Sequence, residues 1–596
     1  MPAKRTAAGP TGRTARRPAA VAAIVAVVAL AIALHALELA SLRRISHDDT
    51  ISFLAATGHQ GEFQRVVDSG LDPVAQWVPA SRWQAYTRIE QPLPLLTIAQ
   101  DLGHHDIHPP VYFWLLHVWS LLVGVQLWTG PALNLVLHAV TAVVLWRLAR
   151  RVLGGPLEAW AVTGIWATLP AVVATAGSTR QYSLAALWSV LVVSAFLRIR
   201  DDGERGPGGR RDLVALAAWT AVGMLTLYTF AVLVAGLGLV CLVDLLSVER
   251  RRSALQRRGA FAAAGAVFLA GQPWLREALA RQRDQAETFS SARMELRARL
   301  LRDGLPSFAV ADVTASGAIG LLIVAMALAT VAWFTRPAAR PIVWLAIWLP
   351  AFLSAAYLAA LSPGASYQAR YFSIALPWLA FLPVAAWPVL RGRPLVVIAA
   401  AVAFTGAAVV NLGAAIDATD EPPATTLDGP RPAVLDNLAR GVLLRILWDA
   451  PPDLPVYAAD QATLLATADR WLRCDAGLPC HDQPIVLATQ VQYDATARGQ
   501  RALLDAAREV REVTPAPDIG VIAERYALSA PTGDVAGSAA AASVPGSTQS
   551  GARSRTASHT MAHRTATRAT AATASAGYGA AGDRPWRQPR YQNSAQ

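Results

Sequence analysis

The sequence is poor in charged residues. Only 16% of its 596 residues are charged and 54% are hydrophobic, whereas about a quarter of the residues of a soluble globular protein are charged. The hydrophobic residues fall in blocks of about 20, the length that a helix needs to cross a bilayer. These proportions exclude an ordinary soluble protein and predict an α-helical protein that crosses the membrane several times.

Cysteine is also scarce, since the chain has only three, too few for a disulfide framework. Cys241 lies inside an apolar block, where we interpret it as part of the membrane core. Cys474 and Cys480 are separated by a short loop, and outside the cytoplasm this spacing favours a local disulfide. Two free thiols are the alternative, and metal binding together with His481 is a third.

Several catalytic motifs are absent. The sequence contains no Walker loop, no dinucleotide-binding glycine pattern and no Ser/His/Asp signature. ATP is therefore not a visible energy source, and a substrate that already carries a phosphate leaving group needs none. The net charge of +12 does not indicate nucleic acid, because the arginine clusters lie between the apolar blocks and in the tails, as the positive-inside rule expects.

The arginine clusters predict how the chain is threaded through the membrane. Residues 1–18 are basic and precede the first apolar block, so we place them in the cytoplasm. The later clusters satisfy the same rule if residues 111–128, which are rich in Trp, Tyr and Phe, form a helix that lies in the interface. Those clusters lie at 147–151, 198–211, 250–258, 336–340 and 391–393.

This threading predicts a polytopic core of about eleven transmembrane helices within residues 19–415, with a first outer loop over 42–130. The predicted spans are 19–40, 131–146, 157–176, 182–197, 213–230, 231–247, 260–275, 316–334, 342–361, 371–390 and 394–415. The segments 177–181, 276–313 and 362–370 then also lie outside, and we expect the polar 276–313 segment to form a helical lid or rim.

The chain after the last predicted span has a different pattern. Strands are predicted at 455–459, at 485–489 and near 520–523, and they alternate with predicted helices at 462–472 and 495–510. This alternation predicts a small extracytoplasmic α/β domain over residues 416–529. Residues 530–596 contain almost no large apolar residues and many Ala, Ser, Thr and Arg, which predicts a disordered basic tail.

Under this threading the notable polar groups fall on the outer side. Asp48 and Asp49 directly follow the first span, although an acidic side chain near hydrocarbon costs about 2.5–3.5 kcal/mol on insertion scales. A neighbouring like charge raises one of the two pKa values, which suits a general base. The alternative is a helix-end cap at the start of a solvated loop.

A second polar group forms a corner before the aromatic-rich segment. It reads Asp106-Ile107-His108-Pro109-Pro110, and a proline restricts the residue before it to extended geometry, which fixes His108. A metal site with the nearby His104 and His105 is an alternative. The prolines argue against it, because they oppose the helix that would bring His104 and His108 onto one face.

Two arginine–tyrosine pairs occupy polar breaks between apolar blocks. They are Arg180 with Tyr182 and Arg370 with Tyr371. An interfacial arginine often only extends to the lipid headgroups. Two arginines on the same side as the carboxylates suit a phosphate ligand better, because a guanidinium donates two parallel hydrogen bonds to phosphate.

Taken together, these motifs resemble the polyprenyl-phosphate-sugar glycosyltransferases of the membrane GT-C superfamily. The resemblance covers residues 20–415 and is closest to the bacterial branch similar to protein O-mannosyltransferases and to the aminoarabinose transferase that modifies lipid A. The matching residues are Asp48-Asp49, Asp106-x-His108-Pro109-Pro110 with Tyr112, Arg180-x-Tyr182 and Arg370-Tyr371.

The resemblance implies specific roles for these residues. Asp48 would be the catalytic base, Asp49 takes the place of a Glu that is often found there, and His108 stands where the family sometimes carries a phosphate-binding Lys. The implied reaction is a single inverting displacement, in which an acceptor hydroxyl attacks the anomeric carbon and polyprenyl phosphate leaves.

We therefore expect a glycosyltransferase in the plasma (inner) membrane, with its active site outside the cytoplasm. Its expected partners are a polyprenyl-phosphate sugar, an acceptor on a glycan, lipid or protein, and the bilayer, but not nucleic acid. No cofactor is certain, and a divalent metal stays open. The alternatives are a glycolipid transporter or flippase, against which the absence of an internal repeat speaks, and a non-catalytic membrane scaffold. These patterns do not encode the sugar or the acceptor.

Overall fold

The computed structural model describes residues 16–42, 45–202, 209–280, 315–358, 369–390, 405–413, 431–436, 438–473, 485–490, 510–516 and 523–528, with single residues at 301, 416, 427 and 503. Cys474 and Cys480, most of the predicted lid over 276–313 and the predicted tail over 530–596 lie outside these described residues. The predicted span over 394–415 is described only from residue 405 to residue 413.

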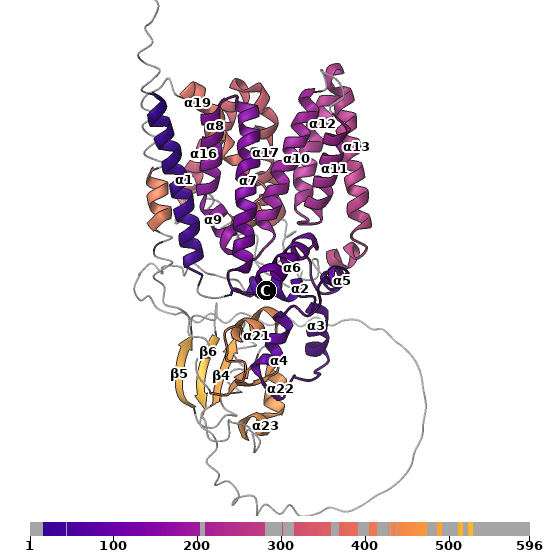
Figure 1. Cartoon of the computed structure of the whole chain (residues 1–596), viewed down its shortest axis with the longest axis vertical. Coiled ribbons are helices and arrows are strands. Elements are labelled where there is room, and N and C mark those ends of the chain that lie inside the picture. The colour runs from indigo at the N-terminus through magenta and orange to yellow at the C-terminus, as the bar shows by residue number, and fades with distance from the viewer. Residues whose placement is uncertain are drawn as a thin grey trace, which may run out of the picture. The chain divides into compact units, whose positions relative to one another are not determined.

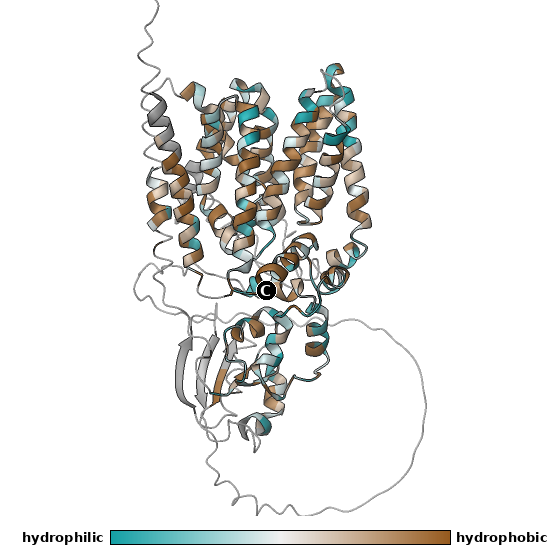
Figure 2. Ribbon diagram, viewed as in Figure 1, coloured by the Kyte–Doolittle hydropathy of each residue, from teal (hydrophilic) through white to brown (hydrophobic). Residues whose placement is uncertain are grey.

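Long helices run side by side through one part of the structure (Figure 1). They are α1 (Arg16–Ala40), α7 (Thr129–Leu153), α10 (Tyr182–Asp202), α11 (Arg210–Met224), α12 (Phe230–Leu245), α13 (Val248–Ala270), α16 (Ala315–Thr335) and α17 (Arg340–Leu358). Hydrophobic residues predominate along the middle of these helices, and hydrophilic residues gather at the end where α11 and α13 begin (Figure 2). That end carries two of the arginine clusters that predicted the threading.

Within the described residues, three helices are long and apolar enough to cross a membrane by length and composition, or four if one bent pair counts as a single span. The three are Thr129–Leu153, Tyr182–Asp201 and Pro337–Leu358. The structure thus supports a helical membrane protein, and the count of eleven spans stays a prediction.

Two predicted spans are interrupted by proline. The 157–176 segment is split into α8 (Pro156–Thr168) and α9 (Pro170–Gly177), which are bent by 58°. Pro170 lacks a backbone donor and disfavours helical geometry at the residue before it. The 371–390 segment is split into η5 (Ala369–Phe372), α18 (Leu376–Leu379) and α19 (Phe381–Leu390). The first break is followed by the chain segment that carries Arg180, and the second is preceded by the segment that carries Arg370.

Short helices fill the first outer loop. They are α2 (His47–Ala56), α3 (Gln60–Asp68), α4 (Ala80–Gln84), η2 (Ala85–Thr87), α5 (Leu95–His105) and α6 (Val111–Val123). The 13 residues of α6 make a helix about 20 Å long, which is shorter than the ~30 Å hydrocarbon core of a bilayer. The aromatic segment that was expected to lie in the interface is therefore too short to cross.

The C-terminal part of the described chain forms a six-stranded sheet in the order β1-β3-β2-β4-β6-β5. Its strands are β1 (Trp77–Pro79), β2 (Ala433–Leu435), β3 (Pro455–Ala458), β4 (Ile485–Gln490), β5 (Val510–Ala516) and β6 (Ala523–Leu528). The central strands β3, β2 and β4 are parallel, and the outer strands pair antiparallel. Its helices are α21 (Arg440–Ile446), α22 (Gln461–Ala466) and α23 (Ala468–Arg473).

The sequence predicted β3 and β4 but not β1, β2 or β5. The strand predicted near 520–523 overlaps β6 only at Ala523, and the rest of that prediction lies outside the described residues. The predicted helix over 462–472 is divided at Thr467 into α22 and α23. The predicted helix over 495–510 lies mostly outside the described residues, and its last residue, Val510, begins β5.

The first outer loop and the C-terminal sheet share one hydrophobic core. β1 comes from the loop and pairs antiparallel with β3, so that Trp77 faces Tyr457 in register. Phe63 and Trp83 from the loop are buried in the same cluster as residues of β2, β3 and α21. The α/β unit therefore includes a strand and buried side chains from the loop that carries the candidate catalytic carboxylates.

Candidate active site

Asp48 lies at the centre of a charged cluster. It occupies the first turn of α2, and its Oδ1 lies 2.6 Å from a guanidinium nitrogen of Arg180. Its Oδ2 accepts a hydrogen bond from Arg370. Arg180 precedes α10 and Arg370 belongs to η5, so three segments far apart in the sequence meet at this carboxylate.

These contacts decide the protonation state of Asp48. Burial by itself would raise the pKa of the carboxyl group, but the guanidinium groups of Arg180 and Arg370 outweigh burial and hold the pKa well below its usual range. Asp48 is therefore ionised throughout the neutral pH range. While both guanidinium groups face it, the carboxylate is a weak proton acceptor.

Asp49 has a different environment from Asp48. Its Oδ2 accepts from the backbone N–H of Ser46, whose hydroxyl accepts from the Asp49 N–H, and this pair forms a capping box at the start of α2. Its Oδ1 accepts from the Thr179 N–H at 2.5 Å. Burial raises the pKa of Asp49. Both oxygens are occupied, so Asp49 ties α2 to the segment that carries Arg180.

The segment that carries Arg180 is fixed on its other side by α7. Asn134 donates from its amide to the carbonyl oxygens of Thr175 and Ser178. Gly130 lies so close to Thr179 that a Cβ at position 130 would overlap the Thr179 side chain. Arg180 is only 5% exposed, and this packing leaves it little freedom to turn away from α2.

Arg370 lies beside two tyrosine rings that also contact each other. Its guanidinium carbon is 5.6 Å from the ring centroid of Tyr182 and 6.0 Å from that of Tyr371, and the two rings are 5.9 Å apart. The ring faces attract the cation. The structure thus brings together Asp48, Arg180, Arg370 and both tyrosines, as the sequence predicted.

Some buried polar atoms of this cluster have no hydrogen-bond partner in the described part of the chain. They are Nη1 of Arg180, Nε of Arg370 and the side-chain amide of Gln181. Buried polar atoms are seldom left without a hydrogen bond. The cluster therefore contains buried hydrogen-bonding capacity that no described residue uses.

Asp106 forms the second cluster. Its Oδ1 accepts from the His108 ring at 2.6 Å and from the Ile107 N–H at 2.7 Å, and its Oδ2 faces Gln60 at 3.1 Å and Arg440 at 2.9 Å. Burial would raise the pKa of Asp106, but Arg440 and His108 hold it well below its usual range. The predicted corner thus anchors a residue of the C-terminal part.

Arg440 and its neighbour connect this cluster to α2. Gly441 packs against the His47 ring so closely that a Cβ there would come within 2.5 Å of ring atoms. Burial lowers the pKa of His47 to about 4, so the ring that packs against Gly441 is uncharged at physiological pH. One turn of α21 therefore contacts both the Asp106 corner and the residue beside Asp48.

The sequence did not identify Gln60, Thr179, Arg440 or Gly441 as part of the site. Thr179 acts through its backbone N–H, which no side-chain pattern reveals. Arg440 is one of 53 basic residues, and nothing around it in the sequence distinguishes it. Its role depends on the docking of α21, which only the structure shows.

The carboxylate of Asp48 is paired with two cations. Both of its carboxylate oxygens face guanidinium groups. Among the residues that the structure describes, no group of three or more His, Cys, Asp or Glu side chains is arranged to hold a metal ion. His104 instead pairs with Glu277 at 2.9 Å, and His108 pairs with Asp106.

Comparison with known proteins now adds to this geometry. Residues 107–275 match a family model described as dolichyl-phosphate-mannose-protein mannosyltransferase. The match begins one residue before the His108-Pro109-Pro110 corner and covers less than half of the chain. It confirms, over this stretch, the resemblance to glycosyltransferases that use polyprenyl-phosphate sugars. No curated protein matches the chain in sequence.

Solved structures with a similar arrangement include two of ArnT from Cupriavidus metallidurans. In the apo state it is 17% identical, with a TM-score of 0.46, and the match covers 85% of this chain and 98% of that one. Bound to undecaprenyl phosphate it is 17% identical, with a TM-score of 0.44 and coverage of 85% and 97%. Archaeal oligosaccharyltransferase AglB from Archaeoglobus fulgidus, in complex with an inhibitory peptide and a dolichol-phosphate, is 11% identical, with a TM-score of 0.42 and coverage of 84% and 74%.

Proposed function

We propose that this chain is a membrane glycosyltransferase that moves a sugar from a polyprenyl-phosphate donor to an acceptor hydroxyl on the outer face of the plasma membrane. The observation that carries the proposal is Asp48, a carboxylate held between Arg180 and Arg370. This arrangement combines a proton acceptor with two phosphate-binding cations in one place. The family match over residues 107–275 supports the class of reaction.

The reaction balances with these groups alone. The acceptor O–H gives its proton to a carboxylate oxygen of Asp48, and the acceptor oxygen forms a bond to the anomeric carbon of the donor. The bond between that carbon and the phosphate oxygen breaks, and polyprenyl phosphate leaves with the electron pair. Arg180 and Arg370 stabilise the charge that develops on the leaving phosphate, and attack from the opposite side inverts the anomeric carbon.

Donor binding also supplies a way to activate the base. A phosphate that accepts hydrogen bonds from Arg180 and Arg370 competes with Asp48 for the same two guanidinium groups. The carboxylate then loses part of the interaction that lowers its pKa, and it becomes a stronger proton acceptor. In this proposal the base is weak until the donor is bound, which limits wasteful attack by other hydroxyls.

The proposed orientation rests on charge. Arginine clusters lie at the end of the bundle where α11 and α13 begin, and positively charged segments face the cytoplasm. Asp48 follows α1 at that helix's C-terminal end, opposite the basic segment that precedes the helix. The active site is then extracytoplasmic, where lipid-linked sugars meet acceptors on glycans, lipids or proteins.

Turnover of lipid-linked sugars tests this function directly. We expect purified protein in liposomes to release polyprenyl phosphate from a donor that carries one hexose or pentose, in step with glycosylation of an added acceptor. The measurement follows a radiolabelled sugar from donor to product across a panel of donors. Unchanged donors across the whole panel, with protein that is folded and binds polyprenyl phosphate, would contradict transferase activity.

Arg370 provides a finer test of phosphate recognition. We expect Arg370→Lys to weaken donor binding by roughly tenfold to a hundredfold, because a charge-assisted hydrogen bond contributes about 1.5–3 kcal/mol and lysine lacks the planar fork. Lysine keeps the charge beside Tyr182 and Tyr371, so folding should be little affected. Binding of polyprenyl phosphate is measured by calorimetry in detergent.

A suitable control for this variant is Arg65→Lys, since Arg65 lies exposed on α3. We expect that change to leave donor affinity as it is. Wild-type donor affinity in Arg370→Lys would show that this arginine extends to the lipid headgroups and does not bind the donor phosphate.

A further inference from the structure

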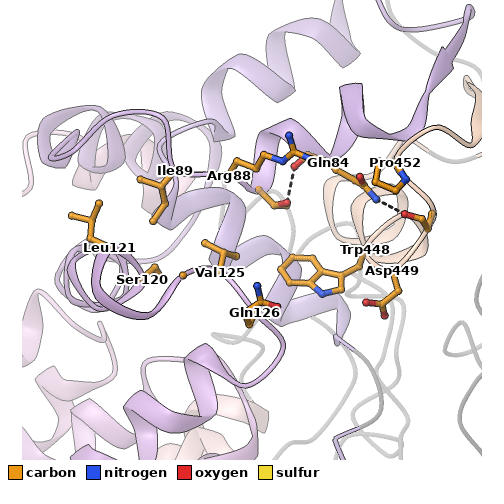
Figure 3. A pocket seen from close by; sticks show the side chains of 13 residues that line it. Gln84, Arg88, Ile89, Ser120, Leu121, Val125, Gln126, Trp448, Asp449 and Pro452 are labelled. Carbon is orange, nitrogen blue, oxygen red and sulfur yellow. Dashed lines mark hydrogen bonds between the residues drawn. The ribbon is translucent and has the colours of Figure 1, made fainter.

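A pocket of about 680 Å³ opens in the outer part of the protein (Figure 3). Three segments line it: residues 84–89 of the first outer loop, residues 120–126 at the end of α6, and residues 448–452 after α21. Gln84 fixes the contact between two of these segments, because its amide donates to the carbonyl oxygens of Leu447 and Ala450, both at 2.8 Å. The pocket is thus built at a packed junction between the loop and the C-terminal part.

Trp448 forms one wall of the pocket. Its indole projects towards Val125 and Gln126, with Ile89 and Leu121 on the far side (Figure 3). The ring packs against Phe53 of α2, with centroids 5.5 Å apart. This contact orients the indole and leaves part of it exposed to the pocket.

The polar side chains of the pocket carry both charges. Arg88, Gln126 and Asp449 are exposed and line the cavity. Within the described part of the chain, neither the Arg88 guanidinium nor the Asp449 carboxylate belongs to a salt bridge. Their hydrogen-bonding capacity is therefore available to a ligand.

This combination suits a neutral sugar. One face of a pyranose or furanose ring presents C–H groups that pack against an indole, and its hydroxyls both donate and accept. Arg88 can only donate and Asp449 can only accept, while Gln126 does both. A charged ligand would be attracted by one of these two groups and repelled by the other, so the pocket has no net preference for either sign and suits a polyhydroxylated ligand without net charge.

We propose that this pocket binds the acceptor, a neutral saccharide, through sugar units remote from the hydroxyl that reacts. The inference rests on the proposed function and adds the chemical class of the acceptor. Phe53 follows Asp48 by five residues on α2, which is about 7.5 Å along the helix axis. The two side chains point about 140° apart, so only an acceptor of several units reaches both the base and the pocket.

Binding energy from remote sugar units can be used at the reacting centre, so the pocket makes turnover depend on acceptor length.

The test compares Trp448→Leu, Asp449→Asn and Arg88→Gln with the wild-type protein. The matched controls are Asp453→Asn, in the same loop but outside the pocket lining, and Arg65→Gln on α3. None of these positions belongs to the charged cluster around Asp48.

Calorimetric binding is measured first, with neutral mannose, galactose and arabinose oligosaccharides from monosaccharide to hexasaccharide. We expect the wild-type protein to bind at least one hexasaccharide about tenfold or more tightly than the matching monosaccharide, and each pocket variant to lose most of this difference. The loss of one hydrogen bond to a charged group corresponds to roughly tenfold or more in affinity. The controls should bind as the wild type does.

Turnover with the same acceptors separates this inference from the proposed function. The pocket variants should lose about tenfold in kcat/KM for the hexasaccharide and nothing for the monosaccharide. Binding of glycerol phosphate in preference to every neutral saccharide, or equal saccharide binding by wild type and pocket variants, overturns the inference even if sugar transfer is observed. Length-dependent binding without any transfer would support the pocket and contradict the proposed transferase.

Discussion

Replacing Asp48 by Asn is expected to lower turnover by a factor of about 10²–10⁴, the typical contribution of a general base, while donor binding is kept or becomes tighter. Asparagine has nearly the same size and cannot accept the acceptor's proton. It also removes the negative charge that competes with the donor phosphate for Arg180 and Arg370. Loss of turnover together with tighter binding is a combination that a misfolded variant cannot give.

The experiment measures turnover, donor affinity and thermal unfolding in Asp48→Asn, with Asp453→Asn as a carboxylate control at an exposed position. A drop in unfolding temperature is expected, because the two guanidinium groups are left without their shared anion. Donor affinity that falls in parallel with turnover would show that Asp48 only positions the arginines. Wild-type turnover would exclude Asp48 as the base.

The pH profile gives a second readout of the same residue. Asp48 has a lowered pKa in the free protein, and the proposed release of its arginines raises that pKa when the donor is bound. The pH dependence of kcat/KM reports the pKa values of the free enzyme, and the pH dependence of kcat reports those of the enzyme–substrate complex. The acid limb should therefore lie at higher pH in kcat than in kcat/KM, and Asp48→Asn should lack it in both.

The sequence predicted the positions of the long helices and the gathering of Asp48, Arg180 and Arg370, because both follow from local signals. Apolar blocks of about 20 residues mark helices, and polar breaks between the blocks lie at helix ends on one side. For the two aspartates the sequence left a base and a helix cap as alternatives. The structure shows Asp49 in the capping box and Asp48 facing the arginines, and the role of Asp48 as the base stays a prediction.

The remaining features depend on long-range contacts that leave no periodic pattern. β1 and β2 have three residues each, too few to show the alternation that marks a strand, and β1 joins a sheet whose other strands lie beyond residue 430. The docking of α21 on Asp106 and His47 has no sequence signature either. Pro170 and Pro377 do mark where the two predicted spans break, and hydropathy alone does not use that signal.

The contact between Arg440 and Asp106 should carry the largest effect on stability. The Asp106 side chain is 3% exposed and that of Arg440 is 20% exposed, and removal of one partner of a buried ion pair costs about 3–5 kcal/mol. We expect Asp106→Asn to lower the free energy of unfolding by this amount. It should also release α21 from the corner, so that limited proteolysis cuts the C-terminal part faster.

Acid offers an independent check on the same carboxylate. The pKa of Asp106 is lower in the folded protein than in the unfolded chain, so its stabilising contribution is full above the unfolded value of about 3.9. The contribution is lost as the pH falls through the folded value. Asp106→Asn should therefore show a weaker loss of stability between neutral and acidic pH than the wild-type protein does.

Two further variants separate the ion pair from a general effect of losing a carboxylate. Asp101 accepts a hydrogen bond from the Gly61 N–H at 2.9 Å, and Asp101→Asn should cost no more than about 1.5 kcal/mol, the contribution of a typical hydrogen bond. Arg440→Gln combined with Asp106→Asn should be less destabilising than the sum of the two single changes, because contacting residues couple. Additive losses in the double variant would mean that Asp106 stabilises the corner through Gln60, Ile107 and His108, and that α21 is held by the His47–Gly441 contact instead.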